Sequence, residues 1–249
     1  MDEFTNFQDY TMKNKKTYQY VFDYFSEQIL SGRLKVNDKI PTEREIAEKL
    51  NVSRNSIREV MHMLEINGLL DCRQGSGNYV RCEPQDYMVT FINMVMSLNN
   101  IDYIEVYDIR MGYETVALRL AIKMATEEEI EELHQILLKM DEIQDPKESA
   151  KLDIEFHNRL VSYSHNRLIV LYYSMLGDLM NRFIEDFRVR IMTDVKQAEA
   201  LRRSHWNIYD ALVTKDFLAG SFAMQRHFEV VGDQMEKIKE EMKKAYKTV

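Results

Sequence analysis

Proline is almost absent from the last two thirds of this chain. Beyond Pro84 the only proline is Pro146, and the sequence around and after it has a helical pattern. A proline inside a helix removes a backbone hydrogen bond and clashes with the preceding turn, so its scarcity favours long, uninterrupted helices. We predict an all-α antiparallel bundle of about seven helices over residues 87–249, after a short polar linker at residues 83–86.

Charge is unevenly distributed along the chain. The total of 33 Lys+Arg and 41 Asp+Glu gives a net charge of −8, which by itself argues against a nucleic-acid partner. By segment, residues 1–11 form an acidic tail with three acids and no bases (−3), residues 12–82 hold 12 bases and 9 acids (+3), and residues 83–249 hold the remaining 21 and 29 (−8). A basic N-terminal module on an acidic body is the pattern expected when one domain meets phosphates and the other does not.

Neither a membrane span nor a secretory leader is indicated. The longest uncharged stretch, residues 87–101, is too short for a bilayer and contains several polar residues, and Asp2 and Glu3 stand where a signal peptide would be basic. The two cysteines, Cys72 and Cys82, have no CxxC spacing, which fits a reducing compartment. We therefore expect a cytoplasmic protein.

A helix-turn-helix pattern begins at Pro41. Thr42 and Glu45 have the spacing of a capping box, which predicts a short helix over residues 43–50. A tight turn follows, and Ser53 can cap a further helix over residues 54–67. Polar side chains fill the first turn of that helix, where a recognition helix meets base edges.

The flanking segments complete a winged helix-turn-helix within residues 12–82. Apolar residues at helical spacing predict a first helix over residues 18–30, and two β-like runs at 69–73 and 78–82 surround the glycines of a hairpin. The sequence thus predicts a mainly α fold, with three helices and a β-hairpin wing followed by the helical bundle.

These segments closely resemble the DNA-binding domain of the GntR family of transcription regulators. The resemblance is carried by Ile40-Pro41-Thr42-Glu43-Arg44-Glu45, by Val52-Ser53-Arg54-Asn55-Ser56-Ile57-Arg58-Glu59, and by the segments 67–70 and 75–80. In FadR-like members the matching positions contact DNA, so the resemblance implies DNA contacts at Arg44, Ser53, Arg54, Asn55, Ser56, Arg58, Gln74 and Gly75. Arg54 can bind guanine O6 and N7 in a bidentate pair.

Plainer roles are also open for some of these residues. Arg44 lies between two glutamates and can serve as a surface ion-pair residue, and Arg58 can pair with Glu59 or Glu65. A glycine such as Gly75 can be required by hairpin geometry alone.

Three of the six histidines fall on apolar helical faces of the second domain: His157, His205 and His227. Asp153 precedes His157 by four residues, so a carboxylate and an imidazole lie side by side on one helix. One carboxylate and three imidazoles from a bundle interior suit a first-row divalent ion such as Zn, Ni or Mn. Taken singly, each histidine is equally compatible with a hydrogen-bonded core or surface residue.

A second resemblance covers nearly all of residues 87–249. The runs 153–160, 164–166, 204–212 and 224–228 resemble the FCD effector-binding domain of FadR-like regulators. That resemblance implies a metal bound by Asp153, His157, His205 and His227, and a carboxylate effector that meets Arg110 near Asn166. A surface ion pair with Glu114 is the alternative role for Arg110.

We therefore expect a sequence-specific DNA-binding regulator, such as a repressor, whose helical domain binds a divalent metal and a small organic acid. A homodimer reading a palindromic double-stranded operator is implied by the resemblance. Two alternatives stay open: a metal-dependent, hydrolase-like enzyme, and a regulator whose C-terminal domain only dimerises.

Overall fold

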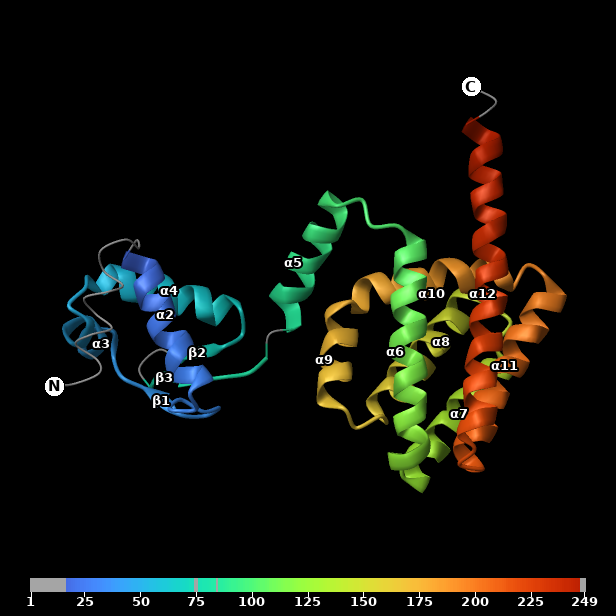
Figure 1. Ribbon diagram of the computed structural model, residues 1–249, viewed down its shortest axis with the longest axis horizontal. Coiled ribbons are helices and arrows are strands. Elements are labelled where there is room, and N and C mark those ends of the chain that lie inside the picture. Colours follow the sequence, from blue (N-terminus) through green and yellow to red (C-terminus); the bar gives the residue numbers. More distant parts are fainter. Residues whose placement is uncertain (1–16, 74–75, 84, 247–249) are drawn as a thin grey trace. The chain divides into compact units, whose positions relative to one another are not determined.

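A computed structural model describes residues 17–73, 76–83 and 85–246 of the chain. The contacts between residues divide the chain into two compact units, and the boundary falls between Thr90 and Phe91. This division lies within α5 (Gln85–Leu98), a helix that already begins inside the linker predicted at residues 83–86 (Figure 1).

The first unit contains three helices and a small sheet. The helices are α2 (Thr17–Leu30), α3 (Glu43–Leu50) and α4 (Arg54–Ile66), and the strands are β1 (Lys39–Ile40), β2 (Leu70–Arg73) and β3 (Gly77–Val80). The sheet is antiparallel in the order β1-β3-β2. Apolar residues from all three helices and the sheet form its core, among them Val21, Phe25, Ile57, Val60 and Leu70.

The helix starts predicted for this unit are confirmed. Thr42 accepts from the backbone N–H of Glu45, whose carboxylate accepts from the Thr42 N–H in return, and α3 begins at Glu43. The Ser53 side chain caps α4 in the same way, accepting from the Ser56 N–H. The strand β1 was not predicted from the sequence, because two residues are too few to show an alternating pattern.

The second unit is a bundle of helices. Besides the end of α5, it contains α6 (Tyr103–Met124), α7 (Glu127–Glu142), α8 (Pro146–Ser162), α9 (Arg167–Met175), α10 (Gly177–Ile191), α11 (Val195–Val213) and α12 (Phe217–Tyr246). Eight helices thus follow the first sheet, where the sequence pattern had indicated about seven. None of the described helices is long and apolar enough to cross a membrane.

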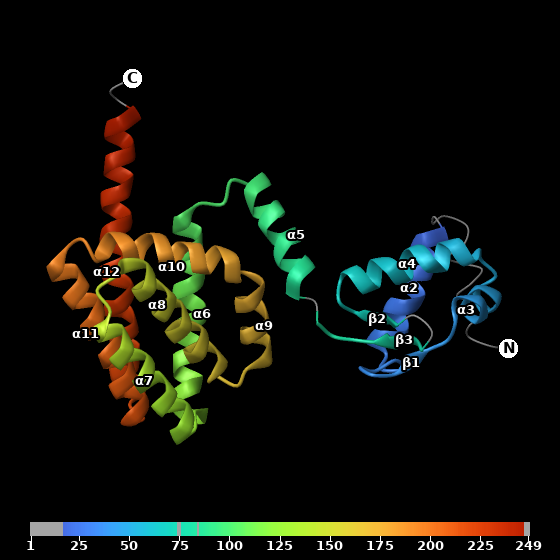
Figure 2. The same ribbon diagram turned by 180° about the vertical axis from the view of Figure 1, so that it is seen from behind.

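Helix α8 occupies the middle of this bundle, packing against α6, α7 and α10 (Figure 2). Asp145 caps its N-terminus and Pro146 stands in its first turn, where the missing N–H costs nothing. The main core joins α8 to α6, α7, α11 and α12 through residues such as Leu118, Leu133, Phe156, Leu160 and Phe228. One face of α8 is therefore held against α6, α11 and α12, the helices that contribute the site described below.

Gly220 on α12 marks a close approach of three helices. A Cβ atom at this position would lie 2.8 Å from Ile122 Cδ1 on α6 and 3.3 Å from Ala211 Cβ on α11. We expect Gly220→Val to lower the free energy of unfolding by about 1–3 kcal/mol, because the helices must move apart. This loss is measured as a shift in the midpoint of urea unfolding, followed by the fluorescence of Trp206, which is the chain's single tryptophan.

Gly112 supplies the matched control. It lies within α6 with nothing within 4 Å of its Cβ position. Gly112→Ala should leave the midpoint unchanged or raise it, because alanine is favoured over glycine by roughly 0.5–1 kcal/mol inside a helix. Equal midpoints for Gly220→Val and the parent chain would contradict the close approach.

Candidate functional site

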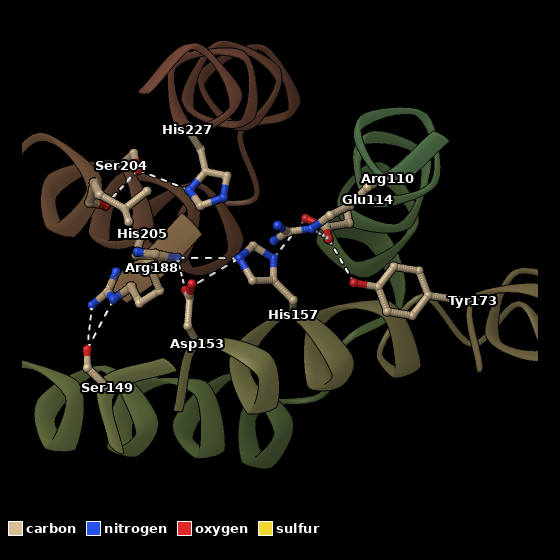
Figure 3. A network of polar contacts seen from close by, with 11 residues as sticks. Arg110, Glu114, Ser149, Asp153, His157, Tyr173, Arg188, Ser204, His205 and His227 are labelled. Carbon is tan, nitrogen blue, oxygen red and sulfur yellow. Dashed lines mark hydrogen bonds and ion pairs between the residues drawn. The ribbon is translucent and has the colours of Figure 1, made fainter. Parts of the chain in front are cut away.

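The three histidines singled out in the sequence converge in the interior of the helical bundle (Figure 3). His157 comes from α8, His205 from α11 and His227 from α12, and one nitrogen of each lies within 4.8 Å of the others. Asp153 joins them from one turn earlier on α8: its Oδ1 lies 2.8 Å from His205 Nε2 and 3.6 Å from His157 Nε2. The three imidazoles are at most 1% exposed.

Polar groups behind the cluster orient two of the rings. Ser204 Oγ lies 3.2 Å from His227 Nδ1, and Glu114 Oε2 lies 2.7 Å from His157 Nδ1, close enough for an ion pair though not aligned as a hydrogen bond. Because the Nδ1 atoms of His227 and His157 interact with Ser204 and Glu114, the Nε2 atoms of these two rings point into the cluster and remain available to a ligand. Such outer partners fix the orientation and tautomer of a metal-binding histidine.

Among the described residues, the buried His227 Nε2 has no hydrogen-bond partner, and the buried Asp153 Oδ1 lies within ion-pair distance of His205 Nε2 without an aligned hydrogen bond. Buried polar atoms without partners are rare and call for an explanation, such as a bound ion. Three imidazole nitrogens and a carboxylate oxygen at these separations are the donor set of a divalent first-row metal. The residues present therefore fit a metal ion.

The pKa shifts of His205, His227 and Asp153 suit such an ion, whereas that of His157 favours a bound proton that the ion would have to displace. Burial lowers the pKa of His205 and takes the pKa of His227 well below its usual range, so both rings are neutral near pH 7. Burial raises the pKa of Asp153, but Arg188 and His205 outweigh it and hold the pKa well below its ordinary value. The pKa of His157 is raised, because Glu114 outweighs the effect of burial.

Arg110 lies beside the cluster on α6, and it is buried. Its Nε donates to Glu114 Oε1 at 2.6 Å, and its guanidinium stacks over Phe183 and Phe228. The pair with Glu114 considered from the sequence thus exists, but not on the surface: the two side chains are 2% and 0% exposed. Nη2 of Arg110 has no hydrogen-bond partner.

Glu114 is the residue of this site that the sequence did not reveal. It contacts three helices, accepting from Arg110 on its own helix and from the Tyr173 hydroxyl on α9 (2.8 Å), and approaching His157 on α8. The Arg-x-x-x-Glu spacing was visible, but only the packing of α6 against α8 brings Glu114 to the histidine. Arg188 and Ser149 were also missed, for the same reason.

Asn166 is not brought to the cluster. It is exposed at the N-terminus of α9, where its side-chain oxygen accepts from the backbone N–H groups of Leu168 and Ile169. A contact between Asn166 and an effector therefore stays a prediction.

The predicted DNA-contacting residues lie in the first unit, around the start of α4. Arg54, Asn55 and Arg58 are exposed on its first turns, Ser53 and Ser56 form its cap, and Arg44 is exposed on α3 within 3.8 Å of Glu48. Gln74 and Gly75 lie outside the described residues.

Glu43 organises the two arginines of α4. Its carboxylate accepts two hydrogen bonds from Arg58, at 3.1 and 2.8 Å, and lies 3.7 Å from Arg54. The partner of Arg58 is thus Glu43 on the preceding helix, not Glu59 or Glu65 on its own. The sequence could not show this, because the partners are fifteen residues apart and meet only when α3 packs against α4.

Family models match both units. The model described as "Bacterial regulatory proteins, gntR family" matches residues 17–80, and the FCD domain model matches residues 105–230, just over half of the chain. This chain belongs to the GntR family and carries an FCD domain. As a member of that family, it is a transcription regulator and not an enzyme, and regulators of the GntR family bind DNA and typically dimerise.

Individual relatives agree with this assignment. The chain is 29% identical over 221 residues to the "Uxu operon regulator" of Haemophilus influenzae, covering 87% of this chain and 80% of the relative. It is 28% identical to the "Putative L-lactate dehydrogenase operon regulatory protein" of Escherichia coli, covering 84% and 82%. The solved structure "Streptococcus agalactiae GntR" shares the fold, with a TM-score of 0.56 and 24% identity over 86% of this chain and 98% of that one.

Replacing Glu114 should lower the stability of this GntR-family protein, because it removes the partner of a buried charge. Without its carboxylate partner Arg110 is left uncompensated, so we expect Glu114→Gln to lower the free energy of unfolding by about 3–5 kcal/mol at pH 7. Tyr173→Phe, which keeps the ion pair and removes one hydrogen bond, should cost about 1 kcal/mol. Urea unfolding in the presence of a chelator measures both.

The loss should depend on pH. Arg110 and His157 outweigh burial and lower the pKa of Glu114 to about 2, whereas an unfolded glutamate titrates near roughly 4.3. The ionised group therefore contributes its full stability above the unfolded pKa and loses it as the pH falls towards 2. The difference between parent and Glu114→Gln should shrink below about pH 4; a constant difference down to pH 3 would show that Glu114 is not held ionised.

Proposed function

We propose that the FCD domain binds one divalent metal ion through Asp153, His157, His205 and His227, and that a small organic acid binding there modulates operator affinity. The observation that carries this is the convergence of three buried imidazoles on the Asp153 carboxylate, with His227 Nε2 left without a hydrogen-bond partner among the described residues. Zn, Ni and Mn are the candidate ions for this donor set. Such an ion supplies open coordination positions and two positive charges.

The charges around the cluster favour an anionic effector. Arg110 and Arg188 are buried cations, and Glu114 and Asp153 are buried anions, so these four residues sum to zero. A divalent ion would leave a buried excess of two positive charges, which a carboxylate ligand offsets. Arg110 supports this role through its partnerless Nη2 atom, and the relative named for an L-lactate dehydrogenase operon is associated by that name with a small organic acid.

Regulation would follow from differential affinity. An effector that binds one arrangement of the DNA-reading units more tightly than another shifts the population towards the arrangement it prefers. The size of the shift is limited by the difference between its affinities for the two arrangements. In a homodimer, two winged helices related by a twofold axis would read a palindromic operator.

Metal analysis tests the proposed centre. We expect about one divalent ion per chain in the purified protein by inductively coupled plasma mass spectrometry, and a large loss in His227→Ala because the ligand set is incomplete. His134→Ala is the matched control, since His134 stacks on Tyr209 outside the cluster. If the parent protein carries no stoichiometric metal, or His227→Ala retains it all, the histidines are structural and the proposed metal centre is wrong.

DNA readout by α4 is tested with Arg54→Ala. If Arg54 contacts a base, its loss should cost about 1–3 kcal/mol on the preferred duplex and relax the preference at one position. Selection from a random pool of duplexes, followed by binding measurements across salt concentrations, gives both quantities.

Arg33→Ala is the charge-matched control for that experiment, because it removes one positive charge from the loop after α2, where Arg33 pairs with Glu27. An unaltered sequence preference in Arg54→Ala, with only a weaker salt dependence, would reassign Arg54 to phosphate contact.

A further inference from the structure

Arg188 on α10 is a buried cation without a carboxylate in contact. Its side chain donates twice to one neutral acceptor, Ser149 Oγ, at 3.1 Å from Nε and 3.0 Å from Nη2. Its remaining nitrogen, Nη1, is buried and has no hydrogen-bond partner. The residue is only 6% exposed.

The other buried arginine of this unit differs in this respect. Arg110 has its carboxylate, Glu114, at 2.6 Å. Arg188 has only the longer-range field of Asp153, whose Oδ1 is already 2.8 Å from His205. A buried charge is normally paired and fully hydrogen-bonded, because leaving water costs several kcal/mol per ion. Arg188 therefore has both the free charge and the free donor of an anion-binding residue.

A surface groove is lined in part by Arg188. Arg188 lines it together with residues from the C-terminal end of α7, the segment after it, the end of α10 and the start of α11. Its walls are part apolar, formed by Met140, Ile143, Met192, Val195 and Ala198, and part polar, formed by Asp141, Gln144, Glu199 and Arg202. At its edge Arg202 bridges Asp141 and Glu199, so this second arginine is already neutralised.

The same arginine adjoins the histidine cluster. Ser149, which holds the guanidinium, and Asp153 lie one turn apart on the same side of α8 (Figure 3). The groove is therefore lined by a cation that lies beside the proposed metal ligands.

We infer that Arg188 is an anion-binding residue that takes the carboxylate of a short-chain organic acid entering through this groove. The carboxylate accepts from Nη1, and the apolar part of the acid lies against the methionine, isoleucine and valine side chains. This inference deepens the proposed function, on which it rests for the idea of an organic-acid effector. It adds a second charge-binding residue, on α10, to Arg110, whose guanidinium is paired with Glu114.

The test uses acetate as the carboxylate probe and acetamide as its neutral counterpart. Binding to the full-length protein is followed by saturation-transfer NMR and by Trp206 fluorescence, because Trp206 Nε1 donates to Asp141 at the groove edge. We expect acetate to bind, acetamide to bind much more weakly, and Arg188→Gln to weaken acetate at least about ten-fold through loss of a charge-assisted hydrogen bond. Arg182→Gln, an exposed position on the same helix, is the matched control.

A second variant leaves Arg188 in place. Ala198→Leu narrows the groove, and acetate affinity should again fall. Unchanged acetate affinity in either Arg188→Gln or Ala198→Leu, or equal binding of acetamide and acetate by the parent protein, would overturn the inference. If Arg188→Gln does not fold by circular dichroism, Ala198→Leu decides.

Metal content, measured on the same samples, separates this inference from the proposed function. Acetate binding that depends on Arg188 in a protein without metal would support the anion site and refute the metal centre. If the protein carries metal and its acetate affinity is the same with and without Arg188, the metal centre is supported and the anion site is refuted.

Discussion

The helical domain depends on compensating charges that have been taken out of water. Glu114 is completely buried and contacts Arg110 on its own helix, Tyr173 on α9 and His157 on α8. Because an unpaired ion in this interior would cost several kcal/mol, these helices can pack only in the register that brings the partners together. The apolar core around Phe156 and Leu160 supplies most of the stabilisation, but it does not by itself select that register.

The same requirement leaves a small number of groups unsatisfied, and those groups define the chemistry of the domain. Among the described residues, Asp153 Oδ1 lies near His205 without an aligned hydrogen bond, His227 Nε2 has no hydrogen-bond partner, and Nη1 of Arg188 lacks an acceptor. A cation suits the first two and an anion suits the third, so one interior can hold a metal and its acidic ligand side by side. In the DNA-binding unit, Glu43 pairs with Arg58 at a partly exposed site, where solvent weakens the interaction.

Much of the fold could be predicted, because many helix boundaries are set by local chemistry. Thr42 and Ser53 each cap the helix that follows them, as predicted, and Thr126 and Asp145 cap their helices through the same local chemistry. The strand β1 escaped prediction because it is formed by pairing with β3, and a two-residue segment carries no periodic signal of its own. The convergence of His157, His205 and His227 followed from resemblance to the FCD domain and from their apolar faces, since no local rule connects three helices.

The sequence by itself determined the helices, the winged helix-turn-helix, the family and the four candidate metal ligands, because caps, apolar periodicity and motif spacing act over a few residues or are carried by family resemblance. Only the tertiary structure decided the burial of Arg110 and the partners of Arg58 and Arg188. It buried Arg110 against Glu114, joined Arg58 to Glu43 across two helices, and left Arg188 with a hydroxyl alone. These pairings depend on how helices distant in sequence pack together, and the free energy of a buried charge depends on every group around it.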